Sequence, residues 1–224
     1  MFFNVLTKIL SRSRLFLLMT VKGNPQRIFC AGVTWGDLEK AGFDDIVAYF
    51  KKRVEACFFD PVENLLLPEY KTTGFVIMAT LSALIDLLSQ YYYSEAKIKH
   101  KDKYKRFLRE QFPEFRHPIS VKAFPFAKDL ADFFYEGFRC SILHNFMLSE
   151  YATIGWKTDL VFLNTWGEGK DCKEIIINPR KLTERLKEIF TRYITDLLDP
   201  KNKSLRDSFA KKLYLDTNVK IKRK

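Results

Sequence analysis

The chain has 224 residues, of which 47% are hydrophobic, and it contains 21 phenylalanines but only 9 glycines. This composition excludes extensive disorder and favours packed helices over a loop-rich fold. A net charge of +11 and a pI near 9.4 favour a polyanionic partner, either nucleic acid or an anionic membrane surface, over a basic surface that serves solubility alone.

The four cysteines and three histidines are too widely spaced to predict a metal site. No Cys-x-x-Cys pair occurs, and no histidine stands at ligand spacing from a cysteine or from another histidine. We therefore expect neither a structural metal nor a disulfide framework, and no cofactor is predicted. Reduced thiols are typical of a cytoplasmic protein.

Residues 1–24 form an apolar extension that basic side chains interrupt. The extension falls short of the roughly 20 unbroken apolar residues that a membrane-spanning helix requires. It also has no small-residue cleavage site before Lys22. We expect an amphipathic surface helix here rather than a membrane protein, with Met19 as an alternative start of the chain.

A single domain is expected over residues 25–216, followed by a basic tail over residues 217–224. The spacing of apolar side chains predicts a first helix over residues 44–59. Asp44 is its expected N-cap, and the Asp-Pro pair that follows is its expected end.

A second helix is predicted over residues 75–93, opened by Thr73. Only Asp86 and Gln90 strongly interrupt its apolar character, which is typical of the central helix of a bundle. A basic amphipathic helix is expected next, over residues 101–112.

The longest helix is predicted over residues 126–150. Two β-like runs joined by a glycine-rich turn then predict a β-hairpin within about residues 160–177. An Asn-Pro pair starts an amphipathic helix at Pro179, and a last helix is expected over residues 204–215. The predicted fold class is thus a mainly α helical bundle with a small β-hairpin insert.

The helix predicted over residues 126–150 carries an Arg-x4-His motif, Arg139 and His144, which is weakly specific by itself. On an α-helical wheel this helix has two apolar arcs. The first is the expected core face and consists of Ala127, Leu130, Phe134, Phe138, Ile142 and Leu148. The second consists of Cys140, Leu143 and Met147, with Glu136 among them. Arg139 and His144 lie about 140° apart on this wheel and flank the second arc on either side.

These two residue types suit cleavage of RNA by its own 2′-hydroxyl, which needs a proton acceptor, a proton donor and a cation beside the charged phosphorane. Histidine supplies acid or base near neutral pH, and arginine supplies a planar fork for phosphate. On the wheel, His144 points away from Arg139 of its own chain. We therefore expect a two-fold dimer that pools both pairs in one cleft, with an interface made by Cys140, Leu143 and Met147.

Four polar neighbours are auxiliary candidates at this site: Glu136, Cys140, Ser141 and Asn145. Covalent catalysis by Ser141 or Cys140 is not expected, because neither stands in a nucleophile-elbow pattern. The simpler alternative is a helix buried on both sides within the bundle, with Arg139 bonded to Glu136 and His144 capping a neighbouring element.

At these residues the sequence resembles the HEPN superfamily of helical domains, whose ribonuclease members carry Arg-x4-His at a symmetric dimer interface. Residues 138–144 read Phe-Arg-Cys-Ser-Ile-Leu-His, and Trp156, the hairpin and an Ile-Ile-Asn-Pro run before a long helix follow them. This order is similar to that of a group of uncharacterised bacterial HEPN-like proteins. The likeness extends over about residues 40–215 and is sharp over residues 133–156.

The resemblance implies a homodimeric, metal-independent endoribonuclease, of the kind that serves in toxin–antitoxin pairs, phage defence and RNA processing. Arg139 would then bind the phosphate, His144 would be the general acid or base, and an antitoxin or regulatory protein would be a partner beside RNA. Cys140 departs from the pattern, since many active members have Asn, Asp or His after the arginine. Two alternatives stay open: a non-catalytic HEPN-like module that binds RNA, nucleotide or a partner protein, and a protein that lies on a membrane surface through residues 1–18.

Overall fold

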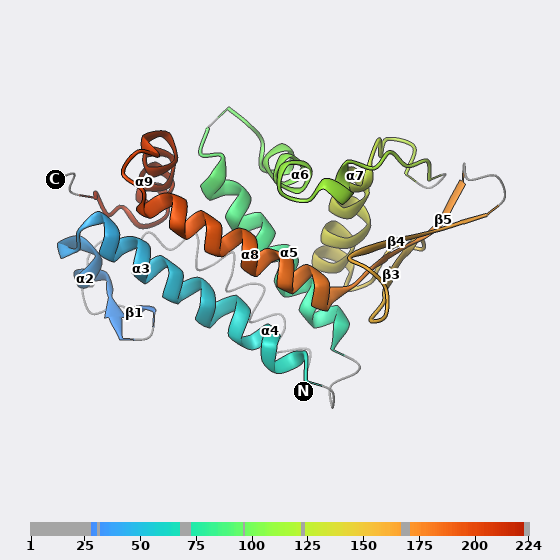
Figure 1. The fold of residues 1–224 in the computed structure, drawn as a ribbon, viewed down its shortest axis with the longest axis horizontal. Coiled ribbons are helices and arrows are strands. Elements are labelled where there is room, and N and C mark those ends of the chain that lie inside the picture. Colours follow the sequence, from blue (N-terminus) through green and yellow to red (C-terminus); the bar gives the residue numbers. More distant parts are fainter. Residues whose placement is uncertain are drawn as a thin grey trace.

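The computed structural model describes residues 28–30, 32–67, 73–95, 97–121, 124–166 and 171–221. Within these ranges the chain is mainly helical, with small sheets, so the predicted fold class is confirmed (Figure 1). The extension predicted over residues 1–24, the turn predicted at residues 167–170 and the last three residues of the tail lie outside the described residues.

A short hairpin and a helix precede the first predicted element. Strands β1 (Ile28–Cys30) and β2 (Val33–Thr34) pair in antiparallel fashion, and α2 (Trp35–Lys40) follows. Thr34 caps this helix, accepting a hydrogen bond from the Asp37 N–H while the Asp37 carboxylate accepts one from the Thr34 N–H. No hydrophobic period can be recognised in strands of two or three residues, so the sequence does not predict them.

The helix predicted over residues 44–59 is longer than expected. It consists of α3 (Phe43–Val54), a π-helical turn η1 (Glu55–Phe59) and α4 (Asp60–Leu65), all with right-handed helical dihedrals at their junctions. The predicted end at the Asp-Pro pair is therefore wrong. In a continuous α-helix the ring of Pro61 would clash with the carbonyl group four residues earlier, that of Cys57. Cys57 lies in the π-helical turn, where the hydrogen bonds span five residues, and Pro61 is accommodated there. The N-cap is Gly42 and not Asp44.

Helix α5 (Gly74–Tyr92) is the centre of the fold, as its apolar sequence predicts. It contacts α6 (His100–Gln111), α8 (Pro179–Leu198), α9 (Lys203–Thr217) and the helix that carries the Arg-x4-His motif. By length and composition alone α5 could cross a membrane, but 67% of its apolar window is buried inside the protein. Its hydrophobicity therefore serves the core.

An ion-pair network fixes the approach to the motif helix. From α6, Arg109 donates through Nε to Asp129 at 2.7 Å and through Nη2 to Asp132 at 2.8 Å. Lys105 lies 2.9 Å from the same Asp132 carboxylate. Asp129 also caps the next helix by accepting from the Asp132 N–H. A 3-10 turn, η2 (Pro113–Arg116), follows α6 in the intervening segment.

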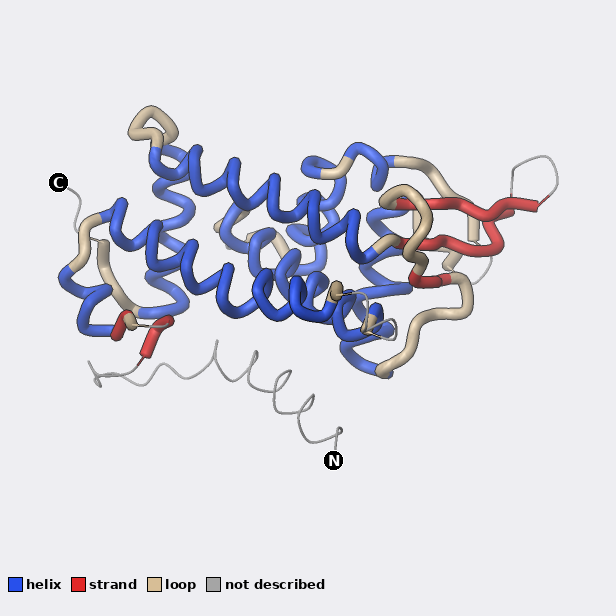
Figure 2. Tube along the Cα trace, turned by 60° about the horizontal axis from the view of Figure 1, so that its bottom comes forward, coloured by secondary structure: helices blue, strands red, loops and turns tan. Residues whose placement is uncertain are grey.

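The predicted β-hairpin is confirmed as β4 (Val161–Trp166) and β5 (Asp171–Ile177), which pair in antiparallel fashion. A third strand, β3 (Ala152–Ile154), pairs parallel to β5 and gives the order β3-β5-β4, which the sequence did not reveal. Figure 2 shows this sheet at one end of the helical body. Helix α8 follows directly, and the Asn178 side chain caps it.

Candidate functional site

The motif helix is shorter than predicted and has a different hydrogen-bond pattern. One α-helical turn, α7 (Leu130–Phe133), leads into a π-helix, η3 (Phe134–Asn145), so the α-helix predicted over residues 126–150 is wrong in both bounds and type. Ala127 and Leu148, predicted on its core face, lie outside the helix. A π-helix bonds each N–H to the carbonyl five residues earlier, is rare, and occurs frequently at functional sites.

The chain turns back on itself where η3 ends. Phe146 takes the left-handed conformation, with φ of 54°, and the Ser149 N–H donates to the Gly137 carbonyl at 3.2 Å. A Cβ on Gly137 would lie 2.9 Å from both the Phe133 ring and the Ser149 hydroxyl. Glycine at this position therefore allows the returning segment to lie against the helix.

The π-helical pattern changes the relation of the two motif residues. A π-helix has about 4.4 residues per turn, so residues five apart are offset by only about 50° around its axis, compared with about 140° in an α-helix. The Ser141 hydroxyl follows the same spacing and donates to the Glu136 carbonyl at 2.9 Å. Arg139 and His144 therefore project from the same side of η3, and the expectation that they flank opposite sides of an apolar arc is wrong.

Arg139 is held by an acidic residue of the central helix. Its Nη2 donates to the Asp86 carboxylate of α5 at 3.1 Å, and its guanidinium lies 5.3 Å from the centre of the Tyr135 ring. Burial alone would lower the pKa of the Arg139 guanidinium, but the charge and hydrogen bond of Asp86, together with Tyr135 and Tyr104, outweigh it, so the pKa is raised. Glu136, the partner foreseen in the simpler alternative, instead lies 3.5 Å from Lys101.

A buried polar layer surrounds this ion pair, contributed by α5, α6 and η3. Arg139 Nε is buried without a hydrogen-bond partner among the described residues, and the Tyr104 and Ser82 hydroxyls are buried close to one another. Burial raises the pKa of Tyr104 well above its ordinary value, and burial raises that of Tyr135 to about 12 although the charge of Arg139 opposes it. Both phenols therefore stay neutral near physiological pH, and Asp86 is the counter-charge that orders Arg139.

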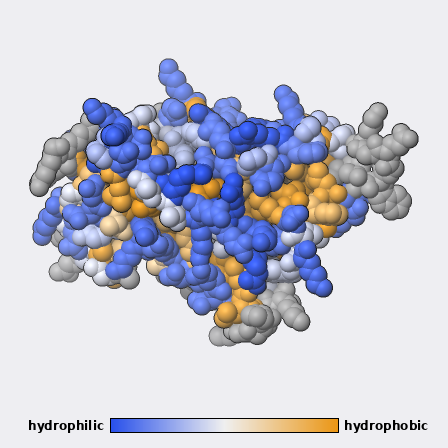
Figure 3. All heavy atoms as spheres, viewed as in Figure 1, coloured by the Kyte–Doolittle hydropathy of each residue, from blue (hydrophilic) through white to orange (hydrophobic). Residues whose placement is uncertain are grey.

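His144 is exposed, and so is Asn145 beside it. Of the predicted interface residues, Met147 is 67% exposed, whereas Cys140 and Leu143 are half-buried. Phe146, which the sequence analysis did not include in the interface, is 41% exposed. Apolar surface also gathers over the end of the molecule that carries the sheet (Figure 3). The helix is thus buried on its α5 side and open near its C-terminal end.

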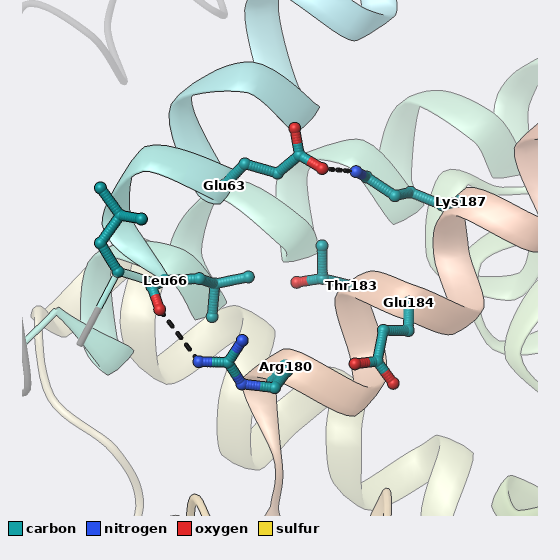
Figure 4. Close-up of a pocket in the computed structure, with 7 residues that line it drawn as sticks. Glu63, Leu66, Arg180, Thr183, Glu184 and Lys187 are labelled. Carbon is teal, nitrogen blue, oxygen red and sulfur yellow. Dashed lines mark hydrogen bonds and ion pairs between the residues drawn. The ribbon is translucent and has the colours of Figure 1, made fainter.

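The described residues form cavities elsewhere. One, of about 370 Å³, lies between α4 and α8 and is lined by Glu63, Leu66, Leu67, Arg180, Thr183, Glu184 and Lys187 (Figure 4). Its cations are already engaged, since Arg180 donates to the Leu66 carbonyl and Lys187 pairs with Glu63. Another, of about 580 Å³, lies where α5, α6 and α9 meet. Neither cavity is lined by Arg139 or His144.

Within the described ranges, no three or more His, Cys, Asp or Glu side chains come together as a metal-binding group. No protein-family model, no curated protein and no solved structure matches the chain.

Proposed function

We propose that the protein is a HEPN-type endoribonuclease that cleaves RNA through its 2′-hydroxyl and acts as a homodimer in the cytoplasm. The observation that carries the proposal is the π-helical spacing, which sets an Asp86-ordered Arg139 and an exposed His144 on one side of η3. A net charge of +11 favours a polyanionic substrate.

In this reaction a base removes the proton of the 2′-hydroxyl, and the 2′-oxygen attacks the adjacent phosphorus. The bond to the 5′-oxygen breaks, an acid protonates that oxygen, and the products are a 2′,3′-cyclic phosphate and a 5′-hydroxyl. His144 of one copy serves as the base and the same histidine of the second copy as the acid. Arg139 stabilises the charged phosphorane.

The ion pair with Asp86 engages one terminal nitrogen of the Arg139 guanidinium and not the other. Nη2 is engaged by Asp86, whereas Nη1 lies 3.8 Å from the Cys140 sulfur, a weak contact. A phosphate oxygen is a far stronger acceptor for a guanidinium than a thiol is. Binding of RNA at Nη1 therefore requires no break in the Asp86 contact.

The proposed dimer brings two η3 helices together near their C-terminal ends. Met147 provides the exposed apolar contact, with Leu143 and Cys140 behind it. The HEPN resemblance extends the proposal to a role in toxin–antitoxin or phage-defence systems, in which an antitoxin or regulatory protein would control the nuclease.

The test uses purified protein, mixed cellular RNA and a chelator. We expect His144→Ala to reduce the cleavage rate by at least about a hundredfold, the scale of general acid–base catalysis. His117→Ala is the matched control, because His117 is also exposed but belongs to the segment after η2. Equal degradation by the wild type and His144→Ala would identify a contaminating nuclease and remove the enzymatic proposal.

One observation favours a second candidate, a non-catalytic HEPN-like module that binds RNA. The Asp86–Arg139 pair also fixes η3 to α5, which is a structural role. Such a module would bind RNA equally well with and without His144, and its RNA would stay intact.

A further inference from the structure

Two buried lysines of α6 differ in whether a carboxylate accompanies them. Lys103 and Lys105 are each 7% exposed. The Lys105 amine lies 2.9 Å from the Asp132 carboxylate, whereas Lys103 has no ion pair or hydrogen bond among the described residues. Its amine is not among the fully buried polar atoms that lack a partner, so it reaches solvent. A largely buried cation without a counter-charge is costly, and an anionic ligand would supply that charge.

Cations of α9 lie near this amine. Burial is the largest reason why the pKa of Lys103 is lowered; the charges of Lys212 and Lys211 lower it further, and the charge of Glu95 opposes them. Lys212 is paired with Asp216, but Lys211 forms no ion pair within the described part of the chain. Helices α6 and α9 lie on either side of the C-terminal end of α5, and their lysines approach one another there (Figure 1).

The cavity of about 580 Å³ lies between the same helices and extends this basic surface. Arg106 lines it one turn after Lys103, and Lys201 and Lys203 line it where α9 begins. Glu95 both lines the cavity and acts on Lys103, so this lysine lies beside the cavity. The cavity and the lysines next to it therefore form one groove, which we call the basic groove.

The basic groove has an excess of positive charge. Arg106 is paired with Glu110, and two further carboxylates, Glu95 and Asp196, line the cavity. More lysines than these two carboxylates have no ion pair among the described residues: Lys103, Lys201, Lys203 and Lys211. An anion is therefore the ligand that the groove favours.

We propose that the basic groove binds phosphate groups of the RNA backbone beside the cleaved nucleotide, as a second contact of the enzyme with its substrate. This inference rests on the proposed function. Phosphates give the lysines a counter-charge without sequence preference. Tyr92 in the cavity wall follows Asp86, the partner of Arg139, by about 9 Å of helix, so a short strand can reach both sites. A concave groove admits a strand, whereas a flat bilayer cannot enter it.

The experiment measures binding of a short, fluorescently labelled RNA over a series of salt concentrations, with His144→Ala as background so that the RNA survives. Lys201→Gln with Lys203→Gln removes two positive charges from the groove. Lys40→Gln with Lys52→Gln is the matched control, because it removes the same charge from exposed lysines of α2 and α3. We expect the groove variant to bind about tenfold more weakly and to lower the salt slope by about 1.4, as for two phosphate contacts on a single strand. The control should change neither.

A second measurement concerns the buried cation. Lys103→Met should raise Tm, because an uncompensated charge leaves the interior, and should weaken RNA binding. Lys105→Met should lower Tm, because Asp132 loses a partner. A fall in Tm for Lys103→Met would show that the protein already compensates this charge, and it would overturn the inference.

Other outcomes also decide against the groove. Equal loss of RNA affinity in the groove variant and the control would make the effect one of net charge alone. Displacement of the RNA by equimolar adenosine monophosphate would identify a site for a free nucleotide. Binding to phosphatidylserine vesicles that the groove variant abolishes, with RNA binding unchanged, would identify a membrane site.

These outcomes are separable from failure of the proposed function. Cleavage of RNA by the wild type, together with groove and control variants that bind alike, refutes the groove alone. Loss of RNA binding in the groove variant, without any cleavage by the wild type, refutes the nuclease alone.

Discussion

Removing Asp86 should destabilise the protein, because it leaves the charge of Arg139 without its counter-charge. The two side chains are 25% and 18% exposed, and Arg139 Nε already lacks a partner among the described residues. Breaking a fully buried pair costs about 3–5 kcal/mol, and partial exposure reduces this to about 2 kcal/mol. For a domain of this size, that corresponds to a fall in Tm of about 4–8 °C for Asp86→Ala.

A double-mutant cycle in urea measures the pair itself. The cycle combines Asp86→Ala with Arg139→Met, which keeps much of the volume of the side chain, and we expect a coupling free energy of about 1–2 kcal/mol. The exposed pair of Lys181 and Glu184, whose side chains are 52% and 51% exposed and whose charged atoms lie 3.2 Å apart, is the matched control and should couple by less than about 0.5 kcal/mol. Equal coupling in the two cycles would refute the view that Asp86 orders Arg139.

Three further predictions concern the helix and its surroundings. Gly137→Ala should lower stability by about 1–3 kcal/mol in thermal unfolding, because its Cβ would clash with the Phe133 ring; a raised Tm, the usual result of Gly→Ala in a helix, would show that the returning segment does not pack as described. Burial raises the pKa of Asp132, but hydrogen bonds and charges from Lys105 and its neighbours lower it by more, so the net shift is downward. The stability that ionised Asp132 contributes is therefore present above about pH 4 and is lost as pH falls through the lowered pKa. Asp132→Asn should flatten the acid side of a plot of unfolding free energy against pH, and an unchanged plot would contradict this. Met147→Glu should convert a dimer to a folded monomer in sedimentation, since Met147 is 67% exposed and its loss leaves the core intact; a persistent dimer would place the interface elsewhere.

The regular helices were predictable because their apolar residues recur with a strong period. The starts of α5, α6, α8 and α9 fall within one residue of the predicted starts, and the helix start at the Asn-Pro pair and the hairpin were correct. Two predicted helix boundaries were wrong. Pro61 lies inside a continuing helix, and the helix predicted to start at residue 126 starts at Leu130.

The geometry of the motif was not predictable from an α-helical wheel. A shift from i→i−4 to i→i−5 bonding leaves no mark on the apolar period over three turns, because the buried residues Phe134, Phe138 and Ile142 suit either pattern. The partner of Arg139 did leave a signal. Asp86 stands in an otherwise apolar helix, and a carboxylate in such a place needs a cation. Only the tertiary contact between α5 and η3 identifies which cation it is.

The chemistry of the product ends tests the central claim most directly. A short single-stranded RNA is incubated with wild-type protein and chelator, beside the same strand carrying a 2′-deoxynucleotide on the 5′ side of the cleaved bond. If His144 and Arg139 of η3 catalyse attack by the 2′-hydroxyl, the products carry 2′,3′-cyclic phosphate and 5′-hydroxyl ends, and the deoxy-substituted strand stays intact. Ends with a 5′-phosphate, or cleavage of the deoxy-substituted strand, would contradict the account.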